Sequence, residues 1–362
     1  MSIRVKDLAA LLNVSSATVS LVLNNKPGLS DATRNRVRNQ IIALGYQDML
    51  SNEPKSEKRD DRNLLFIVYR MRGANAAGTP YFSQLYADII EGVESQVSKK
   101  GYNLMVSYMD QDNLQREAAQ IRNRSAAGIL LLATEMSGEQ IELFLELGIP
   151  MVVIDNYMDS KDFDCVTINN EQGVFEAVSY FLKTGHQEIG YLHVQNNANN
   201  FTERYFGYLR AAQRFGLRVV PDNIIEVVTE QGGEAVYLEL KKQFEKRKHI
   251  PEALFADNDI IAFYAIRVLR ELGYRIPEDI SLIGFDNMML SEITEPPLTT
   301  VQIPKYKIGV LAVNALVDKL NEQTDGFMKT EVKTKLIVRQ SVYVRGANIK
   351  KLRREAYVSQ TF

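Results

Sequence analysis

The 362-residue sequence has one cysteine, Cys165, and three histidines, His186, His193 and His249. A single cysteine cannot form a disulfide within the chain, and the histidines do not have the spacing of metal ligands. Cys165 also has no recognisable base partner for nucleophilic catalysis. No Gly-x-Gly-x-x-Gly or Gly-x4-Gly-Lys-Ser/Thr pattern stands at a strand-to-helix turn, so a nucleotide cofactor has no support. We therefore expect a protein that is not an enzyme, with no catalytic residues, no metal and no cofactor.

Long apolar runs are also missing, because no stretch approaches the length of a membrane span. The first ten residues, MSIRVKDLAA, carry charges where a secretory signal needs an apolar run. With 45% hydrophobic and 24% charged residues, the composition is that of a globular protein. The length leaves room for two or three domains. These features predict a cytoplasmic protein without a membrane partner.

The net charge of −2 is small, but charge is unevenly distributed along the chain. The first fifty residues are basic, whereas the remainder is slightly acidic. The charged residues in the basic segment are Arg4, Lys6, Lys26, Arg34, Arg36 and Arg38, against Asp7, Asp31 and Asp48. A basic segment at one end of the chain indicates a polyanionic partner.

The same fifty residues predict three short helices. Asn13 separates the first two, because asparagine tolerates the left-handed conformation of a tight turn. Ser15 or Ser16 caps the second helix, and Ser30 caps the third after the turn-forming residues 24–28. Apolar residues recur at helical spacing in each helix: Leu8, Ala9 and Leu12; Val19, Val22 and Leu23; Val37, Ile41 and Leu44. Helices this short must share one hydrophobic core, which leaves the second free to lie in a major groove of DNA.

From residue 63 onward, buried strands alternate with amphipathic helices. The predicted strands span residues 64–70, 102–109, 128–133, 150–155, 188–194, 253–258 and 280–286. Such alternation predicts an α/β fold of doubly wound parallel sheets with helices on both faces. About 280 residues are too many for one sheet, so we expect two lobes.

Residues 5–46, VKDLAALLNVSSATVSLVLNNKPGLSDATRNRVRNQIIALGY, resemble the DNA-binding headpiece of the LacI/GalR family of bacterial transcription regulators. The resemblance implies a helix-turn-helix in which Ser16 and Ala17 lie where base edges are read. It places Thr18 and Asn24 where the family contacts phosphate or fixes the docking pose. The candidate DNA-binding residues are Ser15, Ser16, Ala17, Thr18, Leu21 and Asn24.

Two departures from the family pattern stand in or beside this segment. Many members have an arginine that binds guanine where this chain has Leu21. Leu21 either contacts a thymine methyl group or covers the hydrophobic core of the headpiece. The family also continues with an Ala-Arg-x-Leu helix that enters the minor groove, whereas residues 51–62 here are polar and mixed in charge. Leu50 comes too early to replace that leucine, so we expect a flexible linker.

The rest of the chain resembles the effector core of the same family, which shares its fold with periplasmic sugar-binding proteins. The matching segments include TPYFSQLYADIIEGVE, GHQEIGYL, ERYFGYLRA, FADNDIIAFYAIRVLRELGYRIPEDISLIGFDN and PPLTTVQIP. The resemblance implies that the second lobe begins near Ile168 and that the chain crosses between lobes again near Pro297 and Lys333. A small ligand is then expected between the lobes, at the carboxyl ends of the strands.

The resemblance and the strand ends together give the candidate effector-binding residues: Tyr81, Phe82, Asp155, Asn156, Asn200, Arg204 and Asp259. Each has a structural alternative. Asp259 is equally suited to cap a helix, Arg204 to be a solvated helix charge, and the two aromatic residues to belong to a hydrophobic core.

The resemblance therefore implies a homodimeric transcription regulator, a repressor, that binds a palindromic double-stranded DNA operator and responds to a sugar or sugar derivative. The predicted domains are the headpiece (residues 1–50), a flexible polar linker (51–62), a two-lobed periplasmic-binding-protein-like core for effector binding and dimerisation (63–345) and a C-terminal tail (346–362). The alternative is a sugar-binding protein of the same core fold without a regulatory role.

Overall fold

The computed structural model describes residues 4–23, 28–44, 46, 49, 62–70, 80–121, 126–195, 198–228, 233–322 and 326–345, with the backbone alone at 31–32 and 80–85. Residues 51–61 of the linker predicted at 51–62, the predicted tail at 346–362, Asn24 and Leu50 lie outside these residues. The chain divides into two compact units, Met1–Asp61 and Arg62–Phe362, and each is described by itself.

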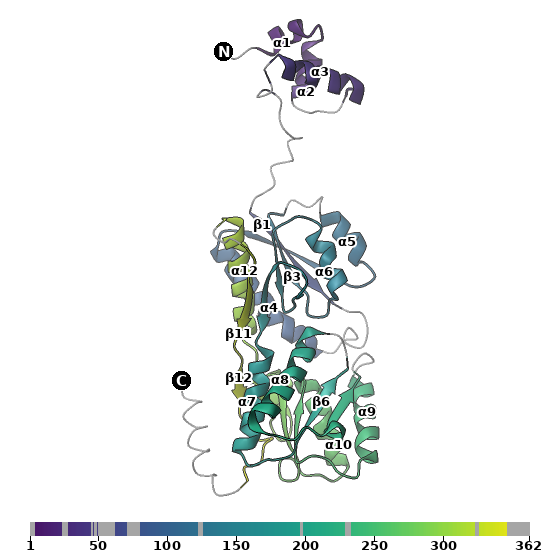
Figure 1. Cartoon of the computed structure of the whole chain (residues 1–362), viewed down its shortest axis with the longest axis vertical. Coiled ribbons are helices and arrows are strands. Elements are labelled where there is room, and N and C mark those ends of the chain that lie inside the picture. Colours follow the sequence, from purple (N-terminus) through teal and green to yellow (C-terminus); the bar gives the residue numbers. More distant parts are fainter. Residues whose placement is uncertain are drawn as a thin grey trace. The chain divides into compact units, whose positions relative to one another are not determined.

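The described part of the first unit consists of α1 (Val5–Leu11), α2 (Ser16–Leu23) and α3 (Asp31–Ala43) (Figure 1). Asn13 has a φ of 52°, which confirms the left-handed turn predicted between α1 and α2. The two helices are bent by 109° to one another. No single helix in the described residues is long and apolar enough to span a membrane; α1 and α2 reach that length and composition only as a bent pair.

Serine caps fix where α2 and α3 begin. The sequence predicted either Ser15 or Ser16 as the cap of α2. Ser15 is the cap, because its Oγ accepts a hydrogen bond from the Thr18 amide at 3.0 Å. Ser30 Oγ accepts from the Thr33 amide at 3.3 Å and caps α3 as predicted. The three helices bury Leu8, Ala9, Leu12, Val19, Val22, Leu23, Val37 and Ile41 together. The prediction for Leu44 was wrong: its side chain is 45% exposed, because α3 ends at Ala43 and the helical spacing stops there.

The second unit contains two six-stranded sheets. The first has the order β11-β5-β4-β3-β1-β2, and all its strand pairs are parallel. Its strands are β1 (Asn63–Tyr69), β2 (Asn103–Met109), β3 (Gly128–Leu132), β4 (Met151–Ile154), β5 (Asp164–Ile168) and β11 (Lys329–Val332). The helices α4 (Pro80–Lys99) and α12 (Lys305–Leu320) pack on one face, and α5 (Leu114–Ile121) and α6 (Gly138–Leu145) pack on the other.

The second sheet has the order β12-β10-β9-β8-β6-β7 and is parallel except for its β10–β12 pair. Its strands are β6 (Ile189–Val194), β7 (Ile224–Val227), β8 (Ala253–Ala256), β9 (Ser281–Asp286), β10 (Thr299–Gln302) and β12 (Lys335–Ile337). The helices α7 (Asn170–Lys183) and α8 (Asn199–Phe215) cover one face, and α9 (Gly233–Lys246) and α10 (Asp259–Glu271) cover the other. A 3-10 turn, η2 (Pro221–Asn223), and α11 (Met289–Ile293) complete the unit.

The chain passes between the two sheets three times. It leaves the first sheet after β5, as predicted near Ile168, and the passage between β11 and β12 contains Lys333. The passage predicted near Pro297 was wrong, because Thr299–Gln302 still pairs with β9 and the crossing follows it. α12 then packs closely on α4 at two glycines, since an added Cβ would lie 2.1 Å from Tyr306 O at Gly92 and 2.3 Å from Ile89 O at Gly309.

Candidate functional site

The candidate DNA-binding residues lie on or beside α2. Ser15, Ser16 and Ala17 are exposed, and Thr18 and Leu21 are half-buried. The Ser15 and Thr18 hydroxyls are 2.8 Å apart and hydrogen-bonded, so their side chains fix the start of the helix. Asn24 lies outside the described residues.

The opposite face of α2 is buried against α1 and α3. Val19, Val22 and Leu23 belong to the hydrophobic core of the headpiece. That packing holds the helix by one side only and leaves the side with Ser16 and Ala17 accessible to a partner. Among the basic residues of α3, Arg36 is exposed and Arg38 is half-buried.

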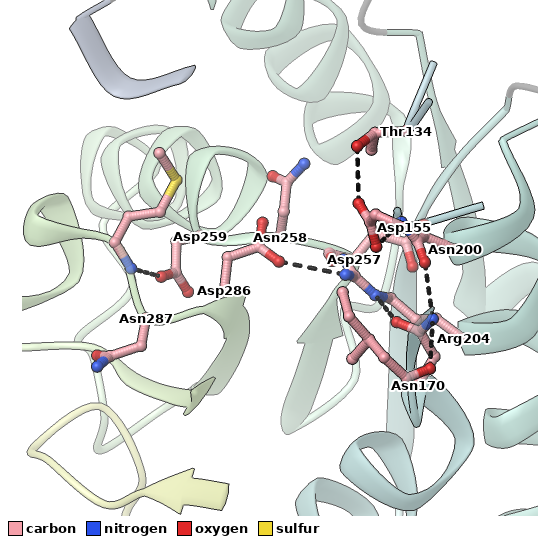
Figure 2. A network of polar contacts seen from close by, with 12 residues as sticks. Thr134, Asp155, Asn170, Asn200, Arg204, Asp257, Asn258, Asp259, Asp286 and Asn287 are labelled. Atoms are coloured by element: carbon pink, nitrogen blue, oxygen red, sulfur yellow. Dashed lines mark hydrogen bonds and ion pairs between the residues drawn. The ribbon is translucent and has the colours of Figure 1, made fainter. Parts of the chain in front are cut away.

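Arg204 is the centre of a polar network in the second unit (Figure 2). Its Nε donates to Asn170 Oδ1 at 2.9 Å and its Nη2 to Asp286 Oδ1 at 3.2 Å, while Nη1 donates to the backbone oxygen of Asp257. The guanidinium carbon lies 3.8 Å from the centre of the Phe285 ring. Arg204 is 3% exposed, so the alternative of a solvated helix charge was wrong.

Asp155 and Asn200 extend the network from the second sheet to the first (Figure 2). Asp155 follows β4 with a φ of 63°, and its Oδ2 accepts from Thr134 Oγ1 at 2.8 Å. Its Oδ1 accepts from Asn200 Nδ2, at the start of α8, at 3.1 Å. Burial raises the pKa of Asp155 to about 6, against the lowering effect of these hydrogen bonds. The pair therefore joins residues at the carboxyl ends of strands in both sheets.

Asn156 has a different environment from its neighbour Asp155. Its Nδ2 donates to the backbone oxygens of Ala133, at 2.7 Å, and Met136, at 2.9 Å. Its Oδ1 accepts from Asn199 Nδ2 at 2.7 Å and from the Tyr157 amide at 2.8 Å. Both ends of the amide are thus bonded within the protein, and Asn156 holds the loops after β3 and β4.

Asp259 is fully buried at the start of α10, but it is not the cap. Asn258 caps the helix, since its Oδ1 accepts from the Ile261 amide at 2.9 Å. Asp259 Oδ2 accepts from the Met288 amide at 2.7 Å, and Oδ1 accepts from Thr300 Oγ1 at 2.5 Å. Burial, and secondarily the nearby Asp286 carboxyl, raise the pKa of Asp259 to about 8. Asp259 therefore connects α10 to the loop after β9 and to β10.

The remaining two candidates, Tyr81 and Phe82, lie in the first turn of α4, where only the backbone is described. Their predicted contact with a ligand stays a prediction. The structure thus brings Asp155, Asn200 and Arg204 into one network and places Asn156 and Asp259 in supporting contacts.

Sequence reasoning missed Asn170, the residue that joins Asn200 to Arg204. Asn170 is buried; its Oδ1 accepts from Arg204, and its Nδ2 donates to Asn200 Oδ1 at 2.8 Å and to Glu203 Oε2 at 2.7 Å. It begins α7 directly after β5, a strand that the sequence analysis did not predict. Asp257 was missed too. It lies within the strand predicted at 253–258 but directly after the observed β8, and its Oδ2 accepts from His193 Nδ1 at 2.8 Å. For Asp257 the available signal was a polar residue at the carboxyl end of a predicted buried strand. Asn170 had no such signal, because β5 was not predicted.

Comparison with known proteins decides the family. The model for bacterial regulatory proteins of the lacI family matches residues 4–48, and that for a periplasmic binding protein-like domain matches residues 178–342. The HTH-type transcriptional repressor PurR of Aliivibrio salmonicida is 31% identical over 343 residues, covering 94% of this chain and 98% of the relative. The chain belongs to the lacI family. A PurR of Klebsiella pneumoniae is also 31% identical, over 93% of this lacI-family chain and 96% of its own length.

Solved structures of lacI-family regulators agree with this fold. A transcriptional regulator CelR-cellobiose complex superposes with a TM-score of 0.69 at 25% identity, covering 94% of this chain and all of the other. A regulator from Enterococcus faecium with bound ribose has a TM-score of 0.63 at 22% identity, which shows the fold alone. The lacI-family protein described here is therefore a DNA-binding transcription regulator with a helix-turn-helix headpiece and a periplasmic-binding-protein-like core, and its relatives are regulators rather than enzymes.

Proposed function

We propose that this lacI-family regulator is a homodimeric repressor that binds a palindromic operator and is controlled by an uncharged sugar or sugar derivative. The headpiece supports the DNA-binding part, because α2 is anchored on one face and exposes Ser16 and Ala17 on the other. Two headpieces in a twofold dimer match the symmetry of a palindrome. The relatives named as repressors support the direction of control.

The observation that carries the effector proposal is the network of Asp155, Asn170, Asn200 and Arg204. It joins the two sheets at the carboxyl ends of their strands, which is where doubly wound sheets bind small molecules. Buried polar groups already fixed by hydrogen bonds suit a ligand that is itself rich in hydroxyl groups.

The charge around this network favours an uncharged ligand over a phosphorylated one. Four carboxyls, those of Asp155, Asp257, Asp259 and Asp286, are buried or largely buried there, and they face two cations, Arg204 and Lys305. A phosphate would add negative charge to a region where burial and mutual repulsion already raise the pKa of Asp259. Sugar hydroxyls can donate to carboxylates without that cost. The cellobiose bound to the 25%-identical CelR points to the same class.

The effector proposal is tested by the melting temperature of the full chain with matched ligand pairs. Neutral sugars, including cellobiose, ribose and glucose, would be compared with their phosphates, and nucleobases would form a third set. We expect at least one neutral sugar to raise the melting temperature, because a ligand that binds only the folded state stabilises it. A sugar phosphate that stabilises the chain more than its parent sugar, or stabilisation by nucleobases alone, would contradict the proposal.

The repressor proposal is tested by selecting duplexes from a random pool with the full chain and measuring binding by fluorescence anisotropy. A palindromic consensus bound by two chains is expected, and sedimentation would give the stoichiometry. The alternative of a sugar-binding protein without a regulatory role predicts ligand binding with no selected DNA sequence.

A further inference from the structure

The outward face of α2 has an unusual chemistry for a helix that reads DNA. Ser16, Ala17 and Ser20 are exposed and Leu21 is half-buried, and these positions lie on one side of the helix. The sequence of α2, SATVSLVL, contains no arginine, lysine, asparagine, glutamine or carboxylate. Every polar side chain of the helix is thus a single hydroxyl.

That composition removes the usual ways of telling bases apart. Guanine is selected by the paired donors of arginine or lysine, adenine by the amide of asparagine or glutamine, and cytosine by a carboxylate. A serine hydroxyl both donates and accepts, so Ser16 and Ser20 fit several base edges. The one base feature that apolar side chains distinguish in the major groove is the C5 methyl group of thymine.

Ala17 and Leu21 are placed to make such an apolar contact. They lie four residues apart, so they are neighbours along the same side of α2. Leu21 is half-buried and lies close to Gly28, since a Cβ added at Gly28 would lie 3.6 Å from Leu21 Cδ1. A half-buried leucine keeps part of its side chain exposed, so its methyl groups are available for an apolar contact with a base.

We propose that α2 reads its operator through thymine methyl groups, contacted by Ala17 and Leu21. The half-site therefore contains thymine where it faces these two residues, and hydroxyl contacts from Ser16 and Ser20 adjust affinity more than sequence preference. This inference rests on the proposed operator binding, and it specifies which chemical group of the DNA the headpiece recognises.

The test changes the DNA rather than the protein, so it does not depend on whether a variant folds. After selection of the operator with the full chain, each thymine of one half-site is replaced in turn by uracil, which removes only the methyl group. Loss of one buried methyl contact corresponds to about a fourfold weaker binding. We expect this loss at one or two thymines of the half-site, and no loss at the others or on a duplex of unrelated sequence.

A protein variant then assigns the contact. Leu21→Ala is expected to bind the thymine and uracil operators equally at the position that Leu21 contacts, while keeping the difference at the position that Ala17 contacts. Leu11→Ala, whose side chain is 61% exposed on α1, is the matched control and should retain both differences.

The outcomes separate this inference from the operator proposal. Sequence-specific binding that is insensitive to every uracil substitution would overturn the inference while leaving operator binding intact, and it would assign selectivity to DNA shape or to residues outside α2. A selected half-site without thymine would overturn it in the same way. If the full chain selects no sequence at all, both the operator proposal and this inference fail.

Discussion

The two units of this protein present their candidate binding residues in opposite ways. The candidates on or beside α2 are exposed or half-buried side chains of one helix, and the hydrogen bonds among them are local, as between Ser15 and Thr18. In the two-lobed core, Arg204 and Asp259 are buried, and they bond to residues distant in sequence. A helix that contacts a long polymer needs to be packed against the protein only on its opposite face, whereas a site for a small molecule must be enclosed. We therefore expect substitutions on the exposed side of α2 to weaken binding without changing stability. Substitutions of the buried network in the core should change both.

Removing the headpiece gives the largest expected effect. A chain starting at Arg62 should keep its thermal stability and ligand response, because the second unit has its own hydrophobic core. It should lose operator binding by more than about 100-fold, since the phosphate and base contacts are expected to come from the headpiece. Anisotropy with operator DNA measures the loss, and undiminished binding would exclude the headpiece as the DNA-binding unit.

Arg204→Ala should have the largest effect among single substitutions in the core. The change leaves Asp286, Asn170 and the Asp257 carbonyl without their shared donor. Removing one partner of a buried charged pair costs on the order of 3 kcal/mol or more, so the core should unfold at markedly lower denaturant concentration. Operator binding should weaken with it.

The matched control for Arg204→Ala is Arg210→Ala, on the same helix. Arg210 pairs with Glu171, but its side chain is 72% exposed, so its loss should change stability by less than about 1 kcal/mol. Urea unfolding of both variants gives the comparison. Equal stabilities would show that the Arg204 network does not hold the core together, and would leave ligand contact as its only function.

The extent to which the sequence predicted this structure follows from how each element is stabilised. The seven predicted strands were confirmed, and six of them are nearly continuous apolar runs that are largely buried. The burial predicted for residues 102–109 was wrong: β2 lies at the edge of its sheet, with Val106 43% and Tyr108 53% exposed. Five strands were missed because they are short: β5, β7, β10, β11 and β12. Among them, β5, with sequence DCVTI, and β11, with sequence KTEV, also carry charged or polar residues. Those residues are tolerated because other parts of the chain satisfy them: Asp164 of β5 accepts from Lys319 Nζ at 2.6 Å.

The candidate site residues show the same difference: features made by neighbouring residues were predicted, and contacts between distant residues were not. The caps Ser15 and Ser30 and the turn at Asn13 are local features, so a few neighbouring residues were enough to predict them. Asn170 could not be predicted, because its partners Asn200 and Arg204 lie about thirty residues away in sequence and meet it only when α7 packs against α8. A resemblance supplied Arg204 as a candidate, but only the fold shows what holds it.

Leu8→Ala should weaken the headpiece without affecting the core. Leu8 is fully buried in a hydrophobic core of few side chains, and such a truncation typically costs about 2–5 kcal/mol. We expect faster hydrogen exchange at the backbone amides of α1 to α3, weaker operator binding, and unchanged exchange in the second unit. Leu11→Ala, on the exposed side of the same helix, is the control. Equal effects of the two substitutions would mean that α1 does not pack in the headpiece as described.

The smallest expected effect is the contribution of Asp259 to the pH dependence of the free energy of unfolding. Its pKa is raised to about 8 in the folded chain, whereas an aspartate in an unfolded chain has a pKa near 4. Between these pH values the folded state holds a proton that the unfolded state has lost, so the free energy of unfolding falls as pH rises. The fall is at most about 1.4 kcal/mol per pH unit and stops above the folded pKa.

Measurements from pH 6.5 to 9 lie above the pKa of about 6 of Asp155, so Asp155 contributes little there. Over that range, urea unfolding of Asp259→Asn should show a shallower fall than the wild type, because its amide does not titrate. Asp279→Asn is the control: Arg275 lowers the pKa of Asp279 to about 2, so this half-buried residue is ionised throughout and its variant should follow the wild-type slope. Parallel slopes for all three proteins would show that Asp259 is already ionised in the folded chain, and would remove one of the arguments for a site that disfavours negatively charged ligands.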